Sequence, residues 1–426
     1  MLDCVLIYLP KPFLKNPDAQ IPLGLAYIAA SLRNKGKTVE IKNFASLTDE
    51  EAIKKLPLAQ LYGITTTGLE IPQANRFAMK IREKIIGANI IIGGPGSYSK
   101  EFVDFNVIDS VFHGDGEITI HDVLEDAYKN QLKKEYIGET IQDLDVLPFP
   151  ARDLFKNKGG DIFAYGEKYN SEESTVITSS RGCVMQCSFC SAPTMTHNNC
   201  IRTRDPFQVA REIEEVKEKY GITNFRFSDD MFCLNEKRTL ALCEEIGPLN
   251  INWRISLRVK PLTENMLKAL KDAGCREFSF GIENMSDSVL KILNKNATVK
   301  DNVRALELSH KYGFTTRVLH MVRTPGQTPE TIEENKYWLK RIPFSIIAST
   351  AMIPLPGTDI WSNPDKYNIE ILDKNLDKYN FYMYNNLGRR KIDPIFKIKD
   401  RDIDEFHQES EDFRDFIEDI GKTNKG

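Results

Sequence analysis

The first third of the chain alternates short apolar runs with amphipathic stretches. The amphipathic stretches 24–36, 72–86 and 118–129 predict helices. The apolar runs predict buried strands at CVLIYLP (4–10), TVEIKNF (38–44), LYGITTTG (61–68), NIIIGGPGS (89–97) and DSVFHGDGE (109–117). Alternating strands and helices, with strands rich in Val, Ile and Leu, are typical of a doubly wound parallel sheet. We therefore expect an α/β domain of Rossmann-like, flavodoxin-like type at the N-terminus.

A second series of alternating strands and helices follows in the middle of the chain. The pattern predicts strands at 175–180, 224–230, 252–258, 277–283, 314–322 and 344–353. Helices are predicted at 205–221, 235–246, 263–273, 286–293, 299–312 and 328–340. A closed barrel has eight strand–helix units, so these six units predict a partial, open (β/α)6 barrel.

Changes in composition suggest where the domains meet. The stretch DLDVLPFPARDLF (143–155) contains two prolines and reads as a linker. Beyond residue 361 the chain is charged and ends in an amphipathic helical pattern. We predict an N-terminal domain at 1–140, a linker at 141–170, a barrel at 171–360 and a small helical cap at 361–426.

Composition narrows the possible environments of this 426-residue chain. Its formal charge is -4 and it has no basic stripe, which argues against binding to nucleic acid. No apolar run approaches the roughly 20 residues that a transmembrane helix needs. Four cysteines stand alone in the sequence, at Cys4, Cys233, Cys243 and Cys275. They read as small buried residues, and the whole composition suits a reducing cytoplasm.

The strongest chemical signal is a cluster of three cysteines, Cys183, Cys187 and Cys190, in SSRGCVMQCSFCSAP. Three thiolates on one short loop can ligate three irons of a [4Fe–4S] cluster and leave the fourth iron open. A zinc-stabilised binding protein, with Cys200 or His197 as a further ligand, is the alternative. Disulfides are disfavoured, because cysteines so close on one loop are poor bridging partners.

The turns that follow the N-terminal strands form a second candidate site. They read Thr65–Gly68, Gly93–Gly96 and Gly114–Glu117. Small residues let backbone amides approach a ligand at the carboxyl edge of a parallel sheet, and threonine hydroxyls add hydrogen bonds. Ordinary turn chemistry would also explain this composition.

The cysteine spacing, with Phe189 before the third cysteine, resembles the radical S-adenosylmethionine (radical SAM) superfamily. The N-terminal turns resemble the cobalamin-binding domain of its cobalamin-dependent members, although the D-x-H-x-x-G motif that supplies a cobalt ligand in many cobalamin proteins is missing. The resemblance implies a [4Fe–4S] cluster, S-adenosylmethionine and cobalamin as cofactors. The residues it implies for cobalamin are Thr66, Thr67, Leu69, Gly94, Pro95, Gly116 and Glu117.

Within the barrel, the resemblance places S-adenosylmethionine near residues that end the predicted strands. These are Asp230 in FSDDMF, Arg258 and Glu283, together with Phe189. Arg204 follows the cysteine loop and reads equally well as an anion ligand or as a structural ion pair. Arg323 stands where the family usually has a glycine. In the cap, Tyr379, Phe381, Tyr382 and Tyr384 either line a substrate pocket or pack in the core.

The function that the resemblance implies is methyl transfer to an unactivated carbon of a small molecule, lipid or peptide. An electron donor such as flavodoxin or ferredoxin would serve as partner. Two alternatives remain open: a radical cyclase, ring-rearranging enzyme or dehydrogenase on the same scaffold, and the zinc-stabilised binding protein.

Overall fold

The computed structural model describes residues 1–11, 14, 17, 21–155, 174–195, 200–379 and 394–423. These residues divide into two compact units. Unit 1 comprises the described residues up to 155 together with 174–176, and unit 2 comprises those from 177 onwards. Unit 1 contains one six-stranded sheet, and unit 2 contains a second one whose edge strand, at residues 174–177, begins in unit 1.

The sheet of unit 1 is parallel and has the strand order β2-β1-β3-β4-β5-β6. This is the flavodoxin-like order with one strand added, and it confirms the predicted fold of the N-terminal part. The strands are β1 (Leu2–Tyr8), β2 (Val39–Asn43), β3 (Ala59–Thr65), β4 (Asn89–Gly93), β5 (Ser110–His113) and β6 (Glu135–Ile137). The sequence pattern did not predict β6, which has three residues with only the central one buried.

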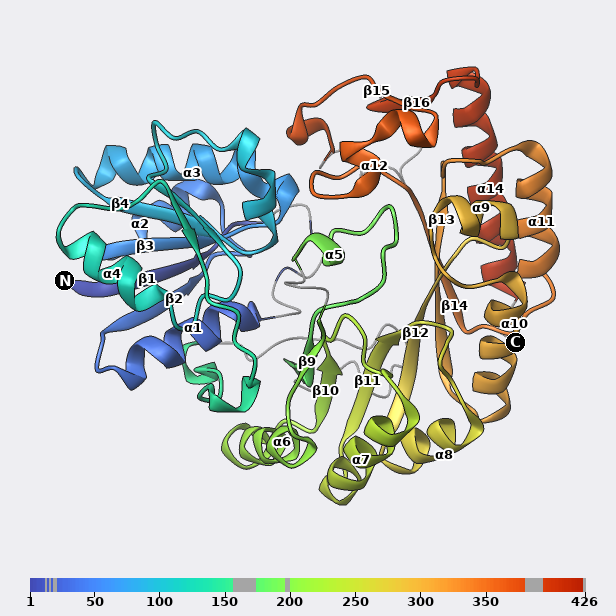
Figure 1. Ribbon diagram of the computed structural model, residues 1–426, viewed down its shortest axis with the longest axis horizontal. Helices are drawn as coiled ribbons and strands as arrows, with labels where there is room; N and C mark the ends of the chain where they lie inside the picture. The colour runs from blue at the N-terminus through green and yellow to red at the C-terminus, as the bar shows by residue number, and fades with distance from the viewer. Residues whose placement is uncertain are drawn as a thin grey trace. The chain divides into compact units, whose positions relative to one another are not determined.

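Helices cover both faces of this sheet. They are α1 (Leu23–Asn34), α2 (Asp49–Lys54), α3 (Ile71–Lys84) and α4 (Ile120–Tyr128). One core contains apolar residues of α1 and α4, and a second core contains those of α2 and α3. Figure 1 shows α1 and α3 on opposite sides of the sheet. The strands are buried on both faces, which explains why they read as continuous apolar runs.

The sheet of unit 2 has the order β14-β13-β12-β11-β10-β7. Its strands are β7 (Ser174–Ile177), β10 (Asn224–Phe227), β11 (Asn252–Leu257), β12 (Cys275–Glu283), β13 (Thr315–Val322) and β14 (Ile346–Ala351). The strands from β10 to β14 pair in parallel, and β7 and β14 form the two edges. All six predicted strands are present, in an open sheet.

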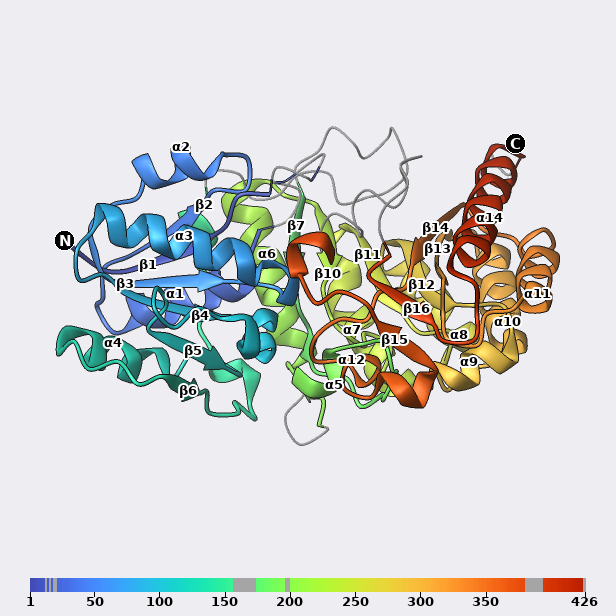
Figure 2. The same cartoon turned by 90° about the horizontal axis from the view of Figure 1, so that it is seen from above.

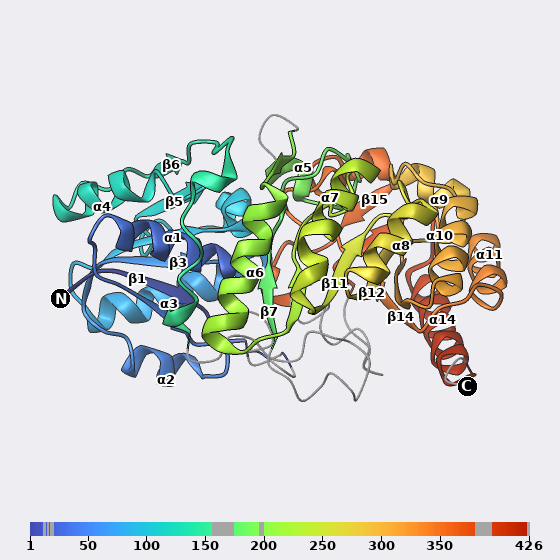
Figure 3. The same cartoon turned by 90° about the horizontal axis from the view of Figure 1, so that it is seen from below.

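The predicted helices of unit 2 are also present: α6 (Pro206–Tyr220), α7 (Glu236–Ile246), α8 (Glu264–Asp272), α9 (Asp287–Ile292), α10 (Val299–Lys311) and α11 (Pro329–Leu339). Figure 3 shows α6, α7 and α8 side by side along the sheet. Local sequence fixes their ends. The Asp205 side chain caps α6, and Gly221 ends it with a φ of 69°.

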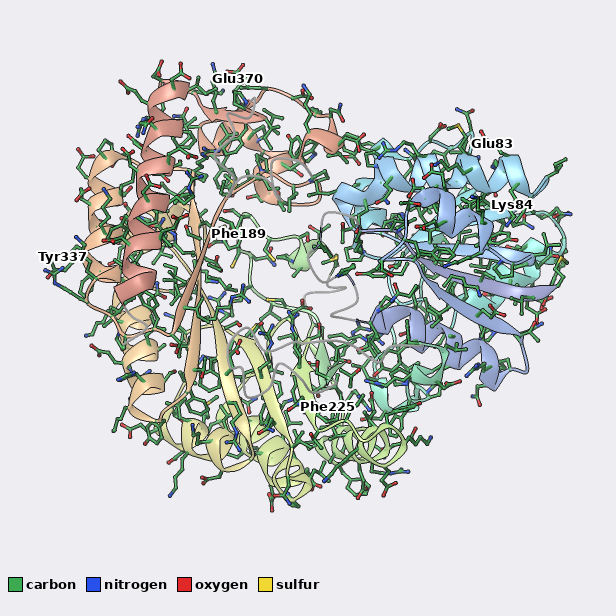
Figure 4. The ribbon with its side chains drawn as sticks, turned by 180° about the vertical axis from the view of Figure 1, so that it is seen from behind. Glu83, Lys84, Phe189, Phe225, Tyr337 and Glu370 are labelled. Carbon is green, nitrogen blue, oxygen red and sulfur yellow. The ribbon has the colours of Figure 1, made fainter. Side chains whose placement is uncertain are left out.

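The two faces of this sheet differ in chemistry. Alternate residues such as Phe225, Trp253 and Phe278 join the apolar core with residues of the helices. Because side chains alternate along a strand, the residues between them face the other way. We call that side the inner face. In Figure 4, Phe225 lies on the side of the helices and Phe189 lies on the inner side.

The C-terminal part was predicted to be a small helical cap, but it is not wholly helical. It contains α12 (Asp359–Ser362), an antiparallel pair formed by β15 (Ile369–Ile371) and β16 (Phe396–Ile398), and α14 (Ile403–Thr423). Figure 2 shows α14 beside α11. Phe413 and Ile420 of α14 join the barrel core, so this helix completes unit 2. In the described residues, no helix has both the length and the apolar character to cross a membrane.

Candidate functional site

The three clustered cysteines lie on a loop at residues 182–191, which we call the cysteine loop. It follows β7 and a short strand, β8 (Ser180–Arg181), as predicted. Two other segments hold it through hydrogen bonds. The Ser188 amide donates to the Leu293 carbonyl over 3.0 Å, and the Ile360 amide donates to the Ser188 carbonyl over 3.0 Å. The Asn294 side chain donates to the Gln186 carbonyl over 2.6 Å.

None of the cysteines of the chain forms a disulfide, as predicted. Within the cysteine loop, burial raises the pKa of Cys183 and raises that of Cys190 to about 11. The three sulfurs are close enough to interact electrostatically. They are not converged, however: within the described ranges, no three His, Cys, Asp or Glu side chains form a group able to hold a metal ion.

The types of side chain in and beside the loop nevertheless suit an iron–sulfur cluster. It offers three thiols on one anchored loop, with a cation beside one of them. Arg258, which follows β11, donates through Nη1 to Sγ of Cys187 over 3.6 Å. A guanidinium in this place offsets the negative charge that thiolate ligands bring. Loading a cluster would require the loop to draw its three sulfurs together and to release their protons.

Two neighbouring carboxylates shape the start of the loop. Oδ2 of Asp230 accepts a hydrogen bond from the Gly182 amide over 3.1 Å, and burial raises the pKa of this carboxyl. Asp229 accepts from the Ser179 amide over 2.8 Å and from the Ser180 hydroxyl over 2.7 Å. Both residues thus support the loop from the end of β10.

Glu283, at the end of β12, forms an ion pair with Lys295 over 2.8 Å, and both side chains are largely buried. Lys295 also lies 5.9 Å from the centre of the Phe189 ring. Gly281 makes room for the pair, since a methyl group there would lie 2.5 Å from Oε1 of Glu283. The predicted residues Cys187, Phe189, Arg258 and Glu283 are therefore linked in one network, which includes Lys295.

Other candidates from the sequence have structural roles. Arg204 forms a buried ion pair with Glu212 over 2.5 Å, which supports the structural reading. Arg323 has a φ of 58°, the conformation that a glycine adopts easily, and its Nε donates to Ser410 of α14. Tyr379 is fully buried and donates to the Asp373 carbonyl, so it packs in the core. Phe381, Tyr382 and Tyr384 lie outside the described residues.

The zinc alternative finds little support. Cys200 is exposed, and its thiol donates to the neighbouring Ile201 carbonyl. His197 lies outside the described residues. The isolated cysteines Cys4, Cys233, Cys243 and Cys275 are buried, as predicted, and are not part of the cysteine loop.

The carboxyl edge of the unit 1 sheet forms the second candidate site. The Thr66 amide donates to the Gly93 carbonyl over 2.9 Å, and the Gly96 amide donates to the Thr66 carbonyl over 2.8 Å. Gly94, with a φ of 80°, lies against Thr65 and Thr66. The turns after β3 and β4 therefore pack together. They bring together the predicted residues Thr66, Thr67, Leu69, Gly94 and Pro95.

This edge contains buried polar atoms that have no hydrogen-bond partner among the described residues. The hydroxyls of Ser97 and Ser99 are buried, and within the described part of the chain neither has a hydrogen-bond partner. Ser99 lies beside Gly68, where a methyl group would stand 2.9 Å from its hydroxyl. Orphaned hydroxyls and a glycine-lined turn fit a polar ligand seated at this edge.

The remaining two predicted cobalamin residues lie on the turn after β5. Gly116 approaches Ile28, and the Glu117 carbonyl accepts a hydrogen bond from the Ser31 hydroxyl. Both residues therefore contact α1.

The sequence reading missed Lys295, Ser97 and Ser99. Lys295 stands between Asn294 and Asn296, whose φ values are 51° and 52°. Asparagine tolerates this left-handed conformation, so the run Asn-Lys-Asn was a usable signal for a tight turn. The serines gave no signal, because a serine after a glycine-rich turn is commonplace.

Comparison with known proteins agrees with this architecture. Residues 177–336 match the model of the Radical SAM superfamily. An uncharacterised methyltransferase of Pyrococcus horikoshii is 28% identical over 406 residues, which cover 89% of this chain and 83% of that protein. The anaerobic magnesium-protoporphyrin IX monomethyl ester cyclase of Rubrivivax gelatinosus is 26% identical over 387 residues, covering 84% of this chain and 68% of the cyclase.

A solved structure extends the likeness to both units. The radical S-adenosylmethionine methyltransferase TsrM of Kitasatospora setae, solved with cobalamin and a [4Fe–4S] cluster, superposes with a TM-score of 0.66. It is 18% identical, and the match covers 84% of this chain and 77% of TsrM. At this identity the likeness concerns the fold. Residues 177–336 therefore form a radical SAM domain, and the chain shares the fold of TsrM.

Proposed function

We propose that this protein is a cobalamin-dependent radical SAM enzyme that transfers a methyl group to an unactivated carbon. The observation that carries the proposal is the anchored cysteine loop, with Arg258 at Sγ of Cys187, in the same chain as a sheet of flavodoxin-like order. The likeness to an uncharacterised methyltransferase of Pyrococcus horikoshii, over 89% of this chain, supports methyl transfer as the reaction.

In unit 2, Cys183, Cys187 and Cys190 would hold the [4Fe–4S] cluster. Arg258 would stabilise the thiolate of Cys187, and Asp230 would fix the loop through Gly182. Glu283 and Lys295 would offer an acceptor and a donor to the zwitterionic amino acid group of S-adenosylmethionine, since one bears a carboxylate and the other an ammonium. Phe189 would cover the ammonium of Lys295.

In unit 1, the cobalamin residues would be Thr66, Thr67, Leu69, Gly94, Pro95, Gly116 and Glu117. The orphaned hydroxyls of Ser97 and Ser99 would add hydrogen bonds. When bound, the cluster supplies the electron that cleaves S-adenosylmethionine, and cobalamin supplies the methyl group. The protein's own share is to position these groups and exclude water.

The finer assignments also belong to this proposal. They are the four-part division at residues 140, 170 and 360, a small-molecule, lipid or peptide substrate, an electron donor such as flavodoxin or ferredoxin, and a cytoplasmic location.

A second candidate function is radical cyclisation without methyl transfer. The likeness to the Rubrivivax gelatinosus cyclase, over 84% of this chain, favours it specifically. The two candidates share the cysteine loop and differ in the fate of the substrate radical.

The test begins with anaerobic reconstitution using iron, sulfide and hydroxocobalamin. We expect about four irons and one cobalt per chain, as for one [4Fe–4S] cluster and one corrinoid. Deoxyadenosine together with a methylated product would support methyl transfer. Deoxyadenosine with a product that gains no methyl group would favour the cyclase. A colourless protein rich in zinc would refute both.

A further inference from the structure

A row of charged side chains crosses the inner face of the unit 2 sheet. Arg226 on β10 is in register with Arg254 on β11, and Arg254 is in register with Glu277 on β12. Arg317 on β13 is in register with Ser279, two residues beyond Glu277. We call Arg226, Arg254, Glu277 and Arg317 the arginine row. Their apolar neighbours face the helices, so the row itself faces inward.

The row has more positive than negative charge. Arg254 donates to Oε1 of Glu277 over 2.8 Å, and both side chains are buried. Glu277 also attracts Arg226, but one carboxylate faces three guanidinium groups, so the row keeps an excess of positive charge. Within the described part of the chain, the side chains of Arg226 and Arg317 form no hydrogen bond or ion pair, and the Nε atom of each is buried without a partner.

This arrangement is unfavourable for the ligand-free protein. Arginine stays protonated in proteins, so its charge cannot be removed cheaply. Burial, followed by repulsion from Arg254 and Arg317, lowers the pKa of Arg226 to about 10. Arg226 and Arg317 are partly buried, so holding their positive charges close to Arg254 costs free energy that an anion would recover. Structural packing alone gives no reason to gather three arginines around one glutamate.

We propose that the arginine row binds an oxyanion of the substrate, a carboxylate or a phosphate group. A guanidinium presents paired N–H donors that match both groups. This inference depends on the proposed radical function only in treating the bound molecule as the substrate. Binding of the anion itself requires no cofactor.

The position of the row also limits the shape of the substrate. Arg254 precedes Arg258 by four residues, which corresponds to about 13 Å along a parallel strand. Arg258 contacts the cysteine loop, so the bound oxyanion lies at about that distance from the radical chemistry. The substrate is therefore an elongated molecule with an anionic group at one end and the reacting carbon toward the other.

The test uses the full chain and measures its thermal unfolding with simple anions. Succinate and inorganic phosphate are added separately, with sodium chloride at equal ionic strength as the reference. A bound anion should raise the unfolding temperature by roughly 2–4 °C. The shift should be lost in Arg226→Gln and Arg317→Gln. It should persist in Arg211→Gln, which alters an exposed arginine of α6, and in Arg258→Met, which alters the cysteine-loop arginine.

The ligand-free variants provide a second readout that a structural role would not produce. Because Arg226→Gln removes an uncompensated charge, it should raise the unfolding temperature of the ligand-free protein by about 1–3 °C. A lower unfolding temperature combined with an unchanged anion shift would overturn the proposal. An anion shift lost in Arg258→Met but kept in Arg226→Gln would overturn it too, by placing the anion at the cysteine loop. Neither result depends on methyl transfer.

Discussion

Arg258 links the cysteine loop to the segment that follows α9. Its Nη1 donates to Sγ of Cys187 over 3.6 Å, while its Nη2 donates to the carbonyl of Lys295. One planar guanidinium thus fixes Cys187, a proposed cluster ligand, relative to the residue that pairs with Glu283. A lysine has neither the fork nor the reach to make both contacts at once.

Replacing Arg258 should weaken retention of the cluster. A hydrogen bond from a charged donor contributes about 1.5–3 kcal/mol, so Arg258→Met should reduce affinity for the cluster about tenfold or more. Arg258→Lys should be intermediate, because it keeps the charge and loses the fork. Iron content after desalting measures the effect, with Arg211→Gln as the control. Full iron retention in Arg258→Met would show that the contact with Cys187 is incidental.

Breaking the Glu283–Lys295 pair should destabilise unit 2. Glu283→Gln leaves the ammonium of Lys295 buried without its counter-ion, which costs about 3 kcal/mol. The double variant Glu283→Gln/Lys295→Met should regain much of this loss, because no charge remains buried. Denaturant unfolding of the wild type, the single variant and the double variant measures the free energy of unfolding that is lost and then regained. Equal stability of the single and double variants would argue against the pair.

The same pair should matter for S-adenosylmethionine. If Glu283 accepts from the ligand, Glu283→Gln should weaken its binding about tenfold, as expected for loss of a charge-assisted hydrogen bond. Isothermal titration of the reconstituted protein measures this. The matched control is Glu264→Gln, an exposed carboxylate at the start of α8, which should bind as wild type does.

Gly96 should not tolerate a side chain. A methyl group there would lie 2.3 Å from the Thr66 hydroxyl and 2.6 Å from the Thr67 carbonyl. Gly96→Ala should force the two turns apart, lower the stability of unit 1 by about 1–3 kcal/mol and reduce corrinoid binding. Gly24→Ala is the control, because nothing lies within 4 Å of its new methyl group and alanine favours the helix α1. Cobalt content and thermal unfolding report both effects.

His320 should make the protein less stable in mild acid. Burial lowers the pKa of this imidazole to about 4, while its Nε2 donates to Oδ1 of Asn335 and its Nδ1 shares a hydrogen bond with the Ser349 hydroxyl. The unfolded chain, with a pKa near 6.5, then binds the proton more tightly than the folded chain. The neutral His320 therefore causes no loss in the free energy of unfolding above about pH 6.5. This free energy falls as the pH drops toward 4, by about 2 kcal/mol at pH 5. His320→Gln should flatten the pH dependence of unfolding between pH 7 and 5, and an unchanged slope would exclude His320 as its source.

The sequence by itself determined most of the architecture. Continuous apolar runs predicted the parallel strands of both units, because strands covered by helices on both faces must be apolar throughout. The three cysteines identified the cysteine loop as the candidate site, since their spacing places three thiols on one short segment. Short edge elements such as β6 escaped, because three residues with one buried side chain carry almost no periodic signal.

The tertiary structure decided which polar residues work together. From the sequence alone Arg204 and Arg258 were equally plausible ligands, and only the fold pairs Arg204 with Glu212 and places Arg258 at Cys187. It also aligns Arg226, Arg254 and Arg317 from three separate strands. Neighbours in a sheet are fixed by strand order and register. These arise from packing between segments that lie far apart in the chain, so no local pattern records them.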